Sequence, residues 1–209
     1  MLDLLPDTVA TAEEHGDLDD AFLFPEEQAM VAKAVETRQR EFATGRACIR
    51  RALGALGLSA APILAGERGA PVWPDGVVGS LTHCAGYRGA AVARSEDMRT
   101  IGIDAEPNQP LPDGVAEAVA LPAELKMLAT LPTHSGAPNW DRLLFSAKES
   151  VYKAWFPVAR VFIGFEAARI EFDPVAETFH AEMLVPGPFS EFTGRWRAER
   201  GLLLTAITV

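Results

Sequence analysis

Two acidic residues, Asp104 and Glu106, stand two positions apart at the end of a predicted strand, residues 100–106. Because side chains alternate between the two faces of a strand, both carboxylates point to the same side. Two neighbouring oxygen ligands suit Mg²⁺, which keeps several waters and completes its octahedron with substrate phosphates. A solvated strand end has the same spacing and is more common, so this pair alone does not decide between the two interpretations.

A third carboxylate, Glu149, lies on a predicted helix of residues 140–156, one turn before Lys153. Glutamate four residues ahead of lysine is the favoured order for a salt bridge on a solvent-exposed helix face. The same face also carries Phe145 and Phe156, and phenylalanines make a poor solvated surface. We therefore expect another part of the chain to cover this face.

Two arginines, Arg38 and Arg46, flank the buried face of another predicted helix, residues 37–56. At about 100° per residue, the buried stripe of this helix consists of Phe42, Ile49, Leu53 and Leu56. Charges at the edge of a core face need anionic partners. Structural salt bridges would supply them, and so would the phosphates of a ligand.

The elements that position these residues are short. A helix begins at Pro25, and further helices are predicted at 122–131 and 140–156, the last with Asn139 as N-cap and Pro157 as its stop. The predicted strands cover residues 77–82, 87–94, 100–106, 162–172, 178–185, 192–199 and 202–209. The first twenty or so residues are expected to form an extended arm, and residues 107–120 a loop. Hairpin-linked strands favour the α+β class, and the order of elements repeats without a sequence repeat.

Composition excludes several classes of protein. The 209 residues carry a net charge of -10, and residues 1–30 hold nine acids and no lysine or arginine. The remainder is close to neutral, so nonspecific nucleic-acid binding, which needs a basic field, is not expected. No apolar run could span a bilayer and no signal peptide is evident, so we expect a cytoplasmic protein that does not bind membranes. The two cysteines, Cys48 and Cys84, form neither a disulfide framework nor a zinc site.

Three blocks together resemble the 4′-phosphopantetheinyl transferases. They are residues 102–106 (GIDAE), residues 145–154 (FSAKESVYKA) and residues 73–84 (WPDGVVGSLTHC). The resemblance extends from about Arg38 to the C-terminus and is greatest to the enterobactin-synthetase-associated branch. It implies an α+β pseudo-dimer of two similar halves with the active site in the cleft between them. We place the halves at residues 1–103 and 104–209.

The resemblance also implies a reaction. Such enzymes transfer the 4′-phosphopantetheine arm of coenzyme A to a serine of an apo acyl or peptidyl carrier protein and release 3′,5′-ADP. Mg²⁺, or Mn²⁺ in its place, would be held by Asp104, Glu106 and Glu149. Glu149 is the candidate base, directly or through a metal-bound water, and Lys153 would stabilise charge on the phosphates. The coenzyme-binding residues implied are Arg38, Arg46, Gly66, Arg68, Thr82, His83, Asp104, Lys148 and Lys153.

Two other functions use the same residues. A carrier-binding module without catalysis would have little reason to keep Asp104, Glu106, Glu149 and Lys153 together. A Mg²⁺-dependent pyrophosphatase or nucleotide hydrolase would need a water-positioning motif, and none is evident. The chain is long enough to supply both halves, so we expect a monomer rather than the trimer of the shorter branch. The natural carrier, the selectivity among acyl donors and the role of the acidic residues 1–30 do not follow from the sequence.

Overall fold

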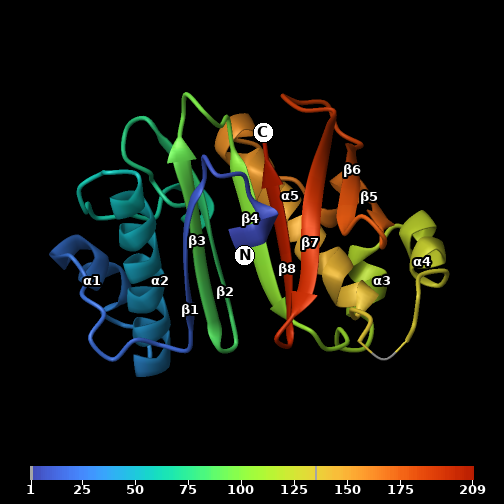
Figure 1. Cartoon of the computed structure of the whole chain (residues 1–209), viewed down its shortest axis with the longest axis horizontal. Coiled ribbons are helices and arrows are strands. Elements are labelled where there is room, and N and C mark those ends of the chain that lie inside the picture. Colours follow the sequence, from blue (N-terminus) through green and yellow to red (C-terminus); the bar gives the residue numbers. More distant parts are fainter. Residues whose placement is uncertain (1, 135) are drawn as a thin grey trace. The chain divides into compact units, whose positions relative to one another are not determined.

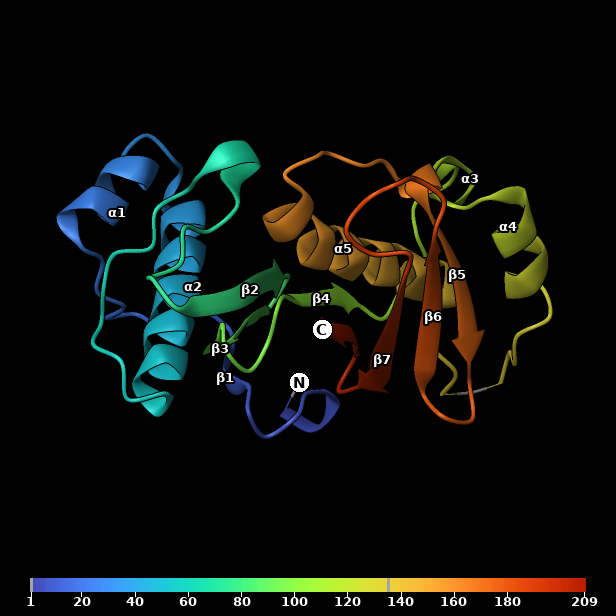
Figure 2. The ribbon, with the colours of Figure 1, turned by 90° about the horizontal axis from the view of Figure 1, so that it is seen from above.

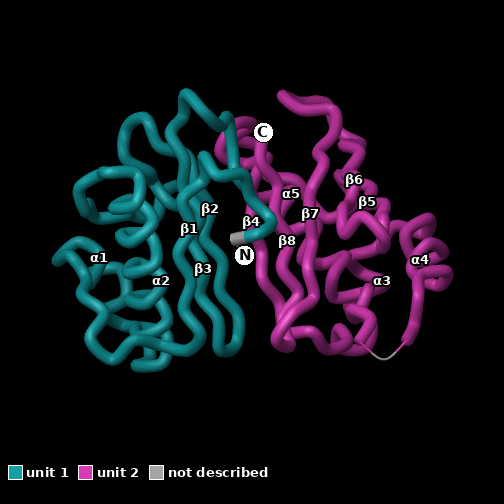
Figure 3. The backbone as a smooth tube through the Cα atoms, in the orientation of Figure 1, with its two compact units in different colours: residues 1–101 teal, residues 102–209 magenta. Residues whose placement is uncertain are grey.

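The computed structural model describes residues 2–134 and 136–209, and the chain divides into two compact units, residues 1–101 and 102–209 (Figure 3). Each unit has one long helix packed on an antiparallel sheet, so the α+β class is confirmed. The division falls after residue 101, whereas the sequence analysis placed it after residue 103.

Unit 1 is a three-stranded sheet, in the order β1-β3-β2, covered on one face by the helix α2 (Figures 1 and 2). Its elements are η1 (Leu2–Leu4), β1 (Ala10–His15), α1 (Pro25–Val31), α2 (Glu36–Ala55), η2 (Glu67–Gly69), β2 (Val77–Cys84) and β3 (Tyr87–Arg94). Ile49 and Leu53 of the predicted stripe are fully buried and pack with Ala90 and Val92 of β3. The apolar periodicity of α2 therefore faces the sheet, as expected.

The prediction of an extended N-terminal arm was wrong in one respect, because residues 10–15 form an edge strand of the sheet. β1 pairs antiparallel with β3, from Ala10 opposite Val92 to His15 opposite Tyr87. Glu13 on this strand accepts a hydrogen bond from the hydroxyl of Tyr87 at 2.8 Å. Glu13 and Glu14 interrupt the alternation of apolar residues by which a strand is recognised in a sequence. An edge strand tolerates such charges.

Unit 2 is a five-stranded antiparallel sheet, in the order β4-β8-β7-β6-β5, with α5 packed on it (Figures 1 and 2). Its elements are β4 (Ile101–Pro107), α3 (Val115–Val119), α4 (Pro122–Leu128), α5 (Trp140–Ala159), η3 (Phe165–Ala167), β5 (Ala168–Asp173), β6 (Thr178–Met183), β7 (Glu191–Glu199) and β8 (Leu202–Thr208). The apolar side of α5 fills the core, where Trp140 meets the ring of Trp196 edge-on at 5.3 Å.

Three predictions for unit 2 were wrong in detail. Pro157 does not stop α5, which continues to Ala159, because a proline in the last turn removes only one helix hydrogen bond. The stretch expected to be a loop contains the short helix α3. Residues 162–167 are a loop and a 3₁₀ turn, and the strand starts only at Ala168. Asn139 is the N-cap residue of α5, as predicted, although its side chain donates to Asn108 Oδ1 at 2.8 Å and makes no capping hydrogen bond.

The two units share a local motif that the sequence analysis missed. Phe24-Pro25-x-Glu27 begins α1 and Leu121-Pro122-x-Glu124 begins α4, each with the glutamate as the third helical residue. Each glutamate accepts a hydrogen bond from the backbone N–H that precedes its helix, as in a capping box. Each also accepts from a distant backbone N–H, that of Ile63 or of Ile170, and both glutamates are buried.

The strand β4 lies directly on α5 at Gly102. A methyl group on this residue would overlap the carbonyl oxygen of Ser150 and come within 2.8 Å of the amide nitrogen of Ala154. Both atoms belong to the helix backbone, so neither can move aside by changing a rotamer. Only glycine allows this approach.

We predict that Gly102→Ala lowers the free energy of unfolding by about 1–3 kcal/mol or more, because the strand must move off the helix. Thermal or urea denaturation measures the change. The matched control is Gly54→Ala, at an exposed position of α2 where an added methyl meets nothing within 4 Å. This substitution should be neutral or stabilising, and equal stability of the two variants would contradict the role of the close contact.

Candidate functional site

The close contact at Gly102 brings the next alternate residues of β4, Asp104 and Glu106, against side chains of α5. Lys153 Nζ donates to Asp104 Oδ1 at 2.7 Å and to the carbonyl oxygen of Ile103 at 3.1 Å. The predicted common direction of Asp104 and Glu106 is therefore observed, since Glu106 also meets a cation of the same helix. The spacing of Glu149 and Lys153 allows a salt bridge between them on the helix surface. In the structure Lys153 instead binds two residues of β4.

Glu106 is paired with an arginine that the sequence analysis did not assign to the site. Arg142 Nη1 donates to Glu106 Oε2 at 2.9 Å, and Nη2 donates to the carbonyl oxygen of Pro110 at 3.0 Å. Burial raises the pKa of the Glu106 carboxyl, the charge of Asp104 raises it further, and Arg142 opposes both effects. The position of Arg142 one turn before Phe145 gives no sign in the sequence of its partner on β4.

Glu149 is half-buried on the same side of α5. Burial raises the pKa of its carboxyl, and the charges of Asp104 and Glu106 add to this effect, while Lys153 lowers the pKa. The three carboxylates are thus close enough to repel one another. Such a cluster attracts a cation and can also take up a proton.

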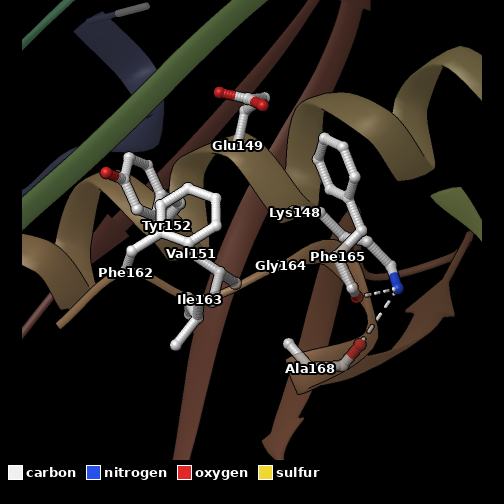
Figure 4. Close-up of a pocket in the computed structure, with 9 residues that line it drawn as sticks. All are labelled: Lys148, Glu149, Val151, Tyr152, Phe162, Ile163, Gly164, Phe165 and Ala168. Carbon is white, nitrogen blue, oxygen red and sulfur yellow. Dashed lines mark hydrogen bonds between the residues drawn. The ribbon is translucent and has the colours of Figure 1, made fainter. Parts of the chain in front are cut away.

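A cavity of about 170 Å³ opens beside Glu149 in unit 2 (Figure 4). Its walls are the α5 residues Lys148, Glu149, Val151 and Tyr152 and the following segment, Phe162, Ile163, Gly164, Phe165 and Ala168. Phe165 packs against Phe145, with ring centroids 5.6 Å apart, so the prediction that another segment covers this helix face is confirmed. The cavity is mostly apolar, with a carboxylate at one side.

Lys148, which the resemblance places near the phosphates, lies in the interior of unit 2. Its ammonium is 2.8 Å from Glu124 Oε2 and donates to the carbonyl oxygens of Phe165 at 2.7 Å and Ala168 at 3.0 Å (Figure 4). An ammonium has three N–H donors, and these three partners use them all. The side chains of Lys148 and Glu124 are 1% and 0% exposed, so no phosphate in solvent reaches this charge.

Unit 1 brings together Arg38 and His83. Arg38 Nη1 lies 3.3 Å from His83 Nε2 and donates to Glu41 Oε2 at 3.2 Å. Arg38 and His83 are both exposed, whereas Thr82, the residue before His83 on β2, is buried. An exposed arginine beside an imidazole is a suitable anion site.

Arg46 forms a salt bridge with Glu27 inside unit 1, which is the structural interpretation that the sequence analysis left open. Its Nε lies 3.5 Å from Glu27 Oε1, and its guanidinium stacks on Phe42 at 4.1 Å from the ring centroid. Burial lowers the pKa of Arg46 to about 10, and Glu27 opposes that shift. The Arg46 side chain is 5% exposed, so it offers little surface to a ligand.

Gly66 and Arg68 lie on an exposed turn rather than in a preformed cradle. Arg68 adopts a left-handed backbone conformation, φ 53°, within η2, and Gly66 N–H donates to the carbonyl oxygen of Ala70 at 2.8 Å. The sequence-predicted residues thus fall into two groups, one in each unit. Unit 2 brings together Asp104, Glu106, Glu149 and Lys153, and unit 1 holds Arg38, Arg46, Gly66, Arg68, Thr82 and His83.

Comparison with known proteins identifies the family. Residues 26–93 match the 4′-phosphopantetheinyl transferase N-terminal domain, and residues 100–198 match the 4′-phosphopantetheinyl transferase superfamily domain. The chain is 54% identical to 4′-phosphopantetheinyl transferase Svp of Streptomyces mobaraensis, over 99% of this chain and 87% of that protein. It is 48% identical to 4′-phosphopantetheinyl transferase PptT of Mycobacterium tuberculosis, over 99% of this chain and 96% of that protein. The chain belongs to the 4′-phosphopantetheinyl transferase superfamily.

The enterobactin branch is a more distant relative of this phosphopantetheinyl transferase. Identity to enterobactin synthase component D of Salmonella typhi is 35%, over 64% of this chain and 54% of that protein. Across the described parts of the chain, no helix is long and apolar enough to cross a membrane.

The donor set of this transferase fits a magnesium ion that is shared with a substrate. Within residues 2–134 and 136–209, no three histidine, cysteine, aspartate or glutamate side chains form a ready-made metal cage. Asp104, Glu106 and Glu149 are instead three mutually repelling carboxylates, two of which are paired with Lys153 and Arg142. Mg²⁺ commonly uses one or two carboxylates together with waters and phosphates, and this chemistry fits.

We predict different stability effects for the two arginines of α2. Arg46→Ala should cost about 3 kcal/mol, because it removes one of the two cations that face the buried Glu27. Arg38→Ala, at a half-exposed side chain, should change stability by less than about 0.5 kcal/mol. Urea denaturation tests both, and an unchanged stability of Arg46→Ala would show that Arg50 alone compensates Glu27.

Proposed function

We propose that this chain transfers the 4′-phosphopantetheine arm of coenzyme A to a serine of an apo acyl or peptidyl carrier protein in a magnesium-dependent reaction. The products are the holo-carrier and 3′,5′-ADP. The observation that carries the proposal is the meeting of Asp104, Glu106, Glu149 and Lys153 where β4 lies on α5. Membership of the transferase superfamily assigns this chemistry to phosphopantetheine transfer.

Glu149 is the base in this proposal. The serine hydroxyl of the carrier attacks the β-phosphorus of coenzyme A, so that an oxygen–phosphorus bond forms and the bond to the departing 3′,5′-ADP breaks. The hydroxyl proton passes to Glu149. The position of Glu149 supports the assignment, since it lies one turn before Lys153 and beside the carboxylates of Asp104 and Glu106.

Asp104, Glu106 and Glu149 would hold Mg²⁺ or Mn²⁺. The ion would neutralise charge on the pyrophosphate and make 3′,5′-ADP a better leaving group. Lys153, fixed by its bonds to Asp104 and the Ile103 carbonyl, presents a positive charge to the same phosphates. Arg142 balances Glu106 and so limits the negative charge of the cluster.

Unit 1 would bind the adenosine end of coenzyme A. Arg38 and His83 carry exposed nitrogens next to each other and are the first candidates for its phosphates. Thr82, Arg46 and the exposed Gly66–Arg68 turn are further candidates. The apolar cavity beside Glu149 would take part of the pantetheine arm. We expect the enzyme to act as a cytoplasmic monomer.

The first prediction is the metal dependence of the transfer. Incubation with coenzyme A, Mg²⁺ and a panel of apo-carriers should add phosphopantetheine to the carrier serine, as read by intact mass. Chelator should abolish the adduct and Mn²⁺ should restore it. Equal modification in excess chelator would refute the metal assignment, and hydrolysis of coenzyme A without a carrier would indicate a hydrolase.

The second prediction separates the base from a metal ligand. Glu149→Gln keeps the size of the side chain but cannot take up a proton, so turnover should fall by about 10²–10⁴-fold while coenzyme A still binds. Asp104→Asn should weaken metal-dependent binding first and recover part of its rate at high Mg²⁺. Metal titration of both variants at saturating carrier is the measurement. Full rescue of Glu149→Gln by metal would leave Glu149 a ligand only.

A further inference from the structure

The buried Lys148–Glu124 pair joins three segments of unit 2. Lys148 lies on α5, immediately before Glu149, and Glu124 lies in the first turn of α4. Glu124 accepts from the N–H groups of Leu121 at 2.6 Å and Ile170 at 2.7 Å. The pair therefore ties α5 to the start of α4 and to the beginning of β5.

The same lysine also holds the wall of the cavity. Its ammonium binds the carbonyl oxygens of Phe165 and Ala168, two residues of the segment that faces α5 across the cavity (Figure 4). The rings of this segment rest on α5, Phe165 on Phe145 at 5.6 Å and Phe162 on Tyr152 at 5.7 Å. Ring contacts alone allow sliding, whereas two carbonyls bound to one buried ammonium fix the distance of the wall from the helix.

We propose that Lys148 and Glu124 are positioning residues that hold residues 162–168 as the wall of the pantetheine-binding cavity. This inference rests on the function proposed above. Lys148 does not touch the phosphates, and its effect on the substrate passes through the backbone of Phe165 and Ala168. It should therefore govern the affinity for the pantetheine arm and leave the affinity for the nucleotide end unchanged.

Unit 1 provides an internal comparison that separates this role from simple stabilisation. Its buried Glu27 also begins a short helix, also accepts from a distant N–H group, and also faces cations of the long helix, Arg46 and Arg50. The cluster of Glu27, Arg46 and Arg50 thus joins α1, α2 and the segment around Ile63 in the same way. The added feature of unit 2 is the pair of bonds from the cation to carbonyls of a cavity wall. These two bonds satisfy the remaining donors of the buried ammonium and at the same time fix two residues that line the cavity.

The test compares two ligands, coenzyme A and adenosine 3′-phosphate 5′-diphosphate, which keeps all the phosphates of coenzyme A and lacks only the pantetheine arm. We expect Lys148→Met to raise the Kd for coenzyme A by about tenfold, the effect of losing a small apolar contact, and to leave the Kd for the nucleotide within about twofold. Titration calorimetry measures both, and hydrogen exchange of residues 162–168 should become faster. Lys148→Arg, which can pair with Glu124 again, should recover part of the coenzyme A affinity.

Because Lys148→Met leaves Glu124 as an uncompensated buried charge, the double variant Lys148→Met/Glu124→Gln provides a second folded protein for the same comparison. Phe179→Leu, a core substitution on β6 outside the cavity wall, is the control for general loss of stability. It should lower the melting temperature and leave the ratio of the two Kd values unchanged.

Three results would overturn the inference. An equal loss of affinity for both ligands would indicate that Lys148 contacts a phosphate. A lower melting temperature with both affinities unchanged would make the pair merely structural, and the same change of ratio in Phe179→Leu would attribute the effect to stability. Failure of the proposed function is recognised separately, because the wild-type protein would then bind no coenzyme A or modify no carrier.

Discussion

The backbone contact between β4 and α5 at Gly102 is the constraint on which the unit 2 site depends. Because the strand touches the helix there, the next alternate residue, Asp104, lies within hydrogen-bond distance of Lys153, one turn beyond Glu149. Any larger residue at 102 would separate strand and helix by the width of a side chain, and bonds of 2.7–3.1 Å between them could not persist. The glycine that precedes the two acids is therefore as much a part of the site as the acids.

Two buried glutamates fix the positions of the long helices, as Gly102 fixes the position of the strand β4. Glu27 and Glu124 each cap a short helix, accept from a distant N–H group, and neutralise cations of α2 or α5. A buried carboxylate with several donors and a cation partner is costly to break, so each holds its long helix in one position. Part of the acidity of residues 1–30 has a related explanation, since Glu14, Asp17 and Glu27 pair with Arg51, Arg88 and Arg46. These three acids are counter-ions for arginines of unit 1.

Sequence patterns found what depends on local spacing. The stripes of α2 and α5, the strands β2 to β4, and the common direction of Asp104 and Glu106 follow from periods of 3.6 and 2. The binding partners of the lysines and arginines were harder to predict, because Lys148 and Lys153 look equivalent in the sequence. Lys148 is buried and anchors a loop, whereas Lys153 is one quarter exposed beside Asp104. That difference depends on Glu124 and on carbonyls from another segment, contacts that no spacing records. The repeated Pro-x-Glu signal was visible, but its meaning required the buried N–H partners.

Two of the cations proposed to meet a phosphate are already held by carboxylates, Arg38 by Glu41 and Lys153 by Asp104. Such pairs cost little to separate at a partly exposed site, because water and ions compensate both charges. In the proposed reaction, a polyphosphate would compete with the carboxylates for the cations, and a divalent ion would compete with Lys153 for Asp104. The two ligands would then assist each other, since the metal would release the lysine that the phosphate needs. Exchange of the internal ion pairs for a metal and a phosphate would keep the net charge of the site balanced in both states, and opposite charges placed side by side suit such an exchange.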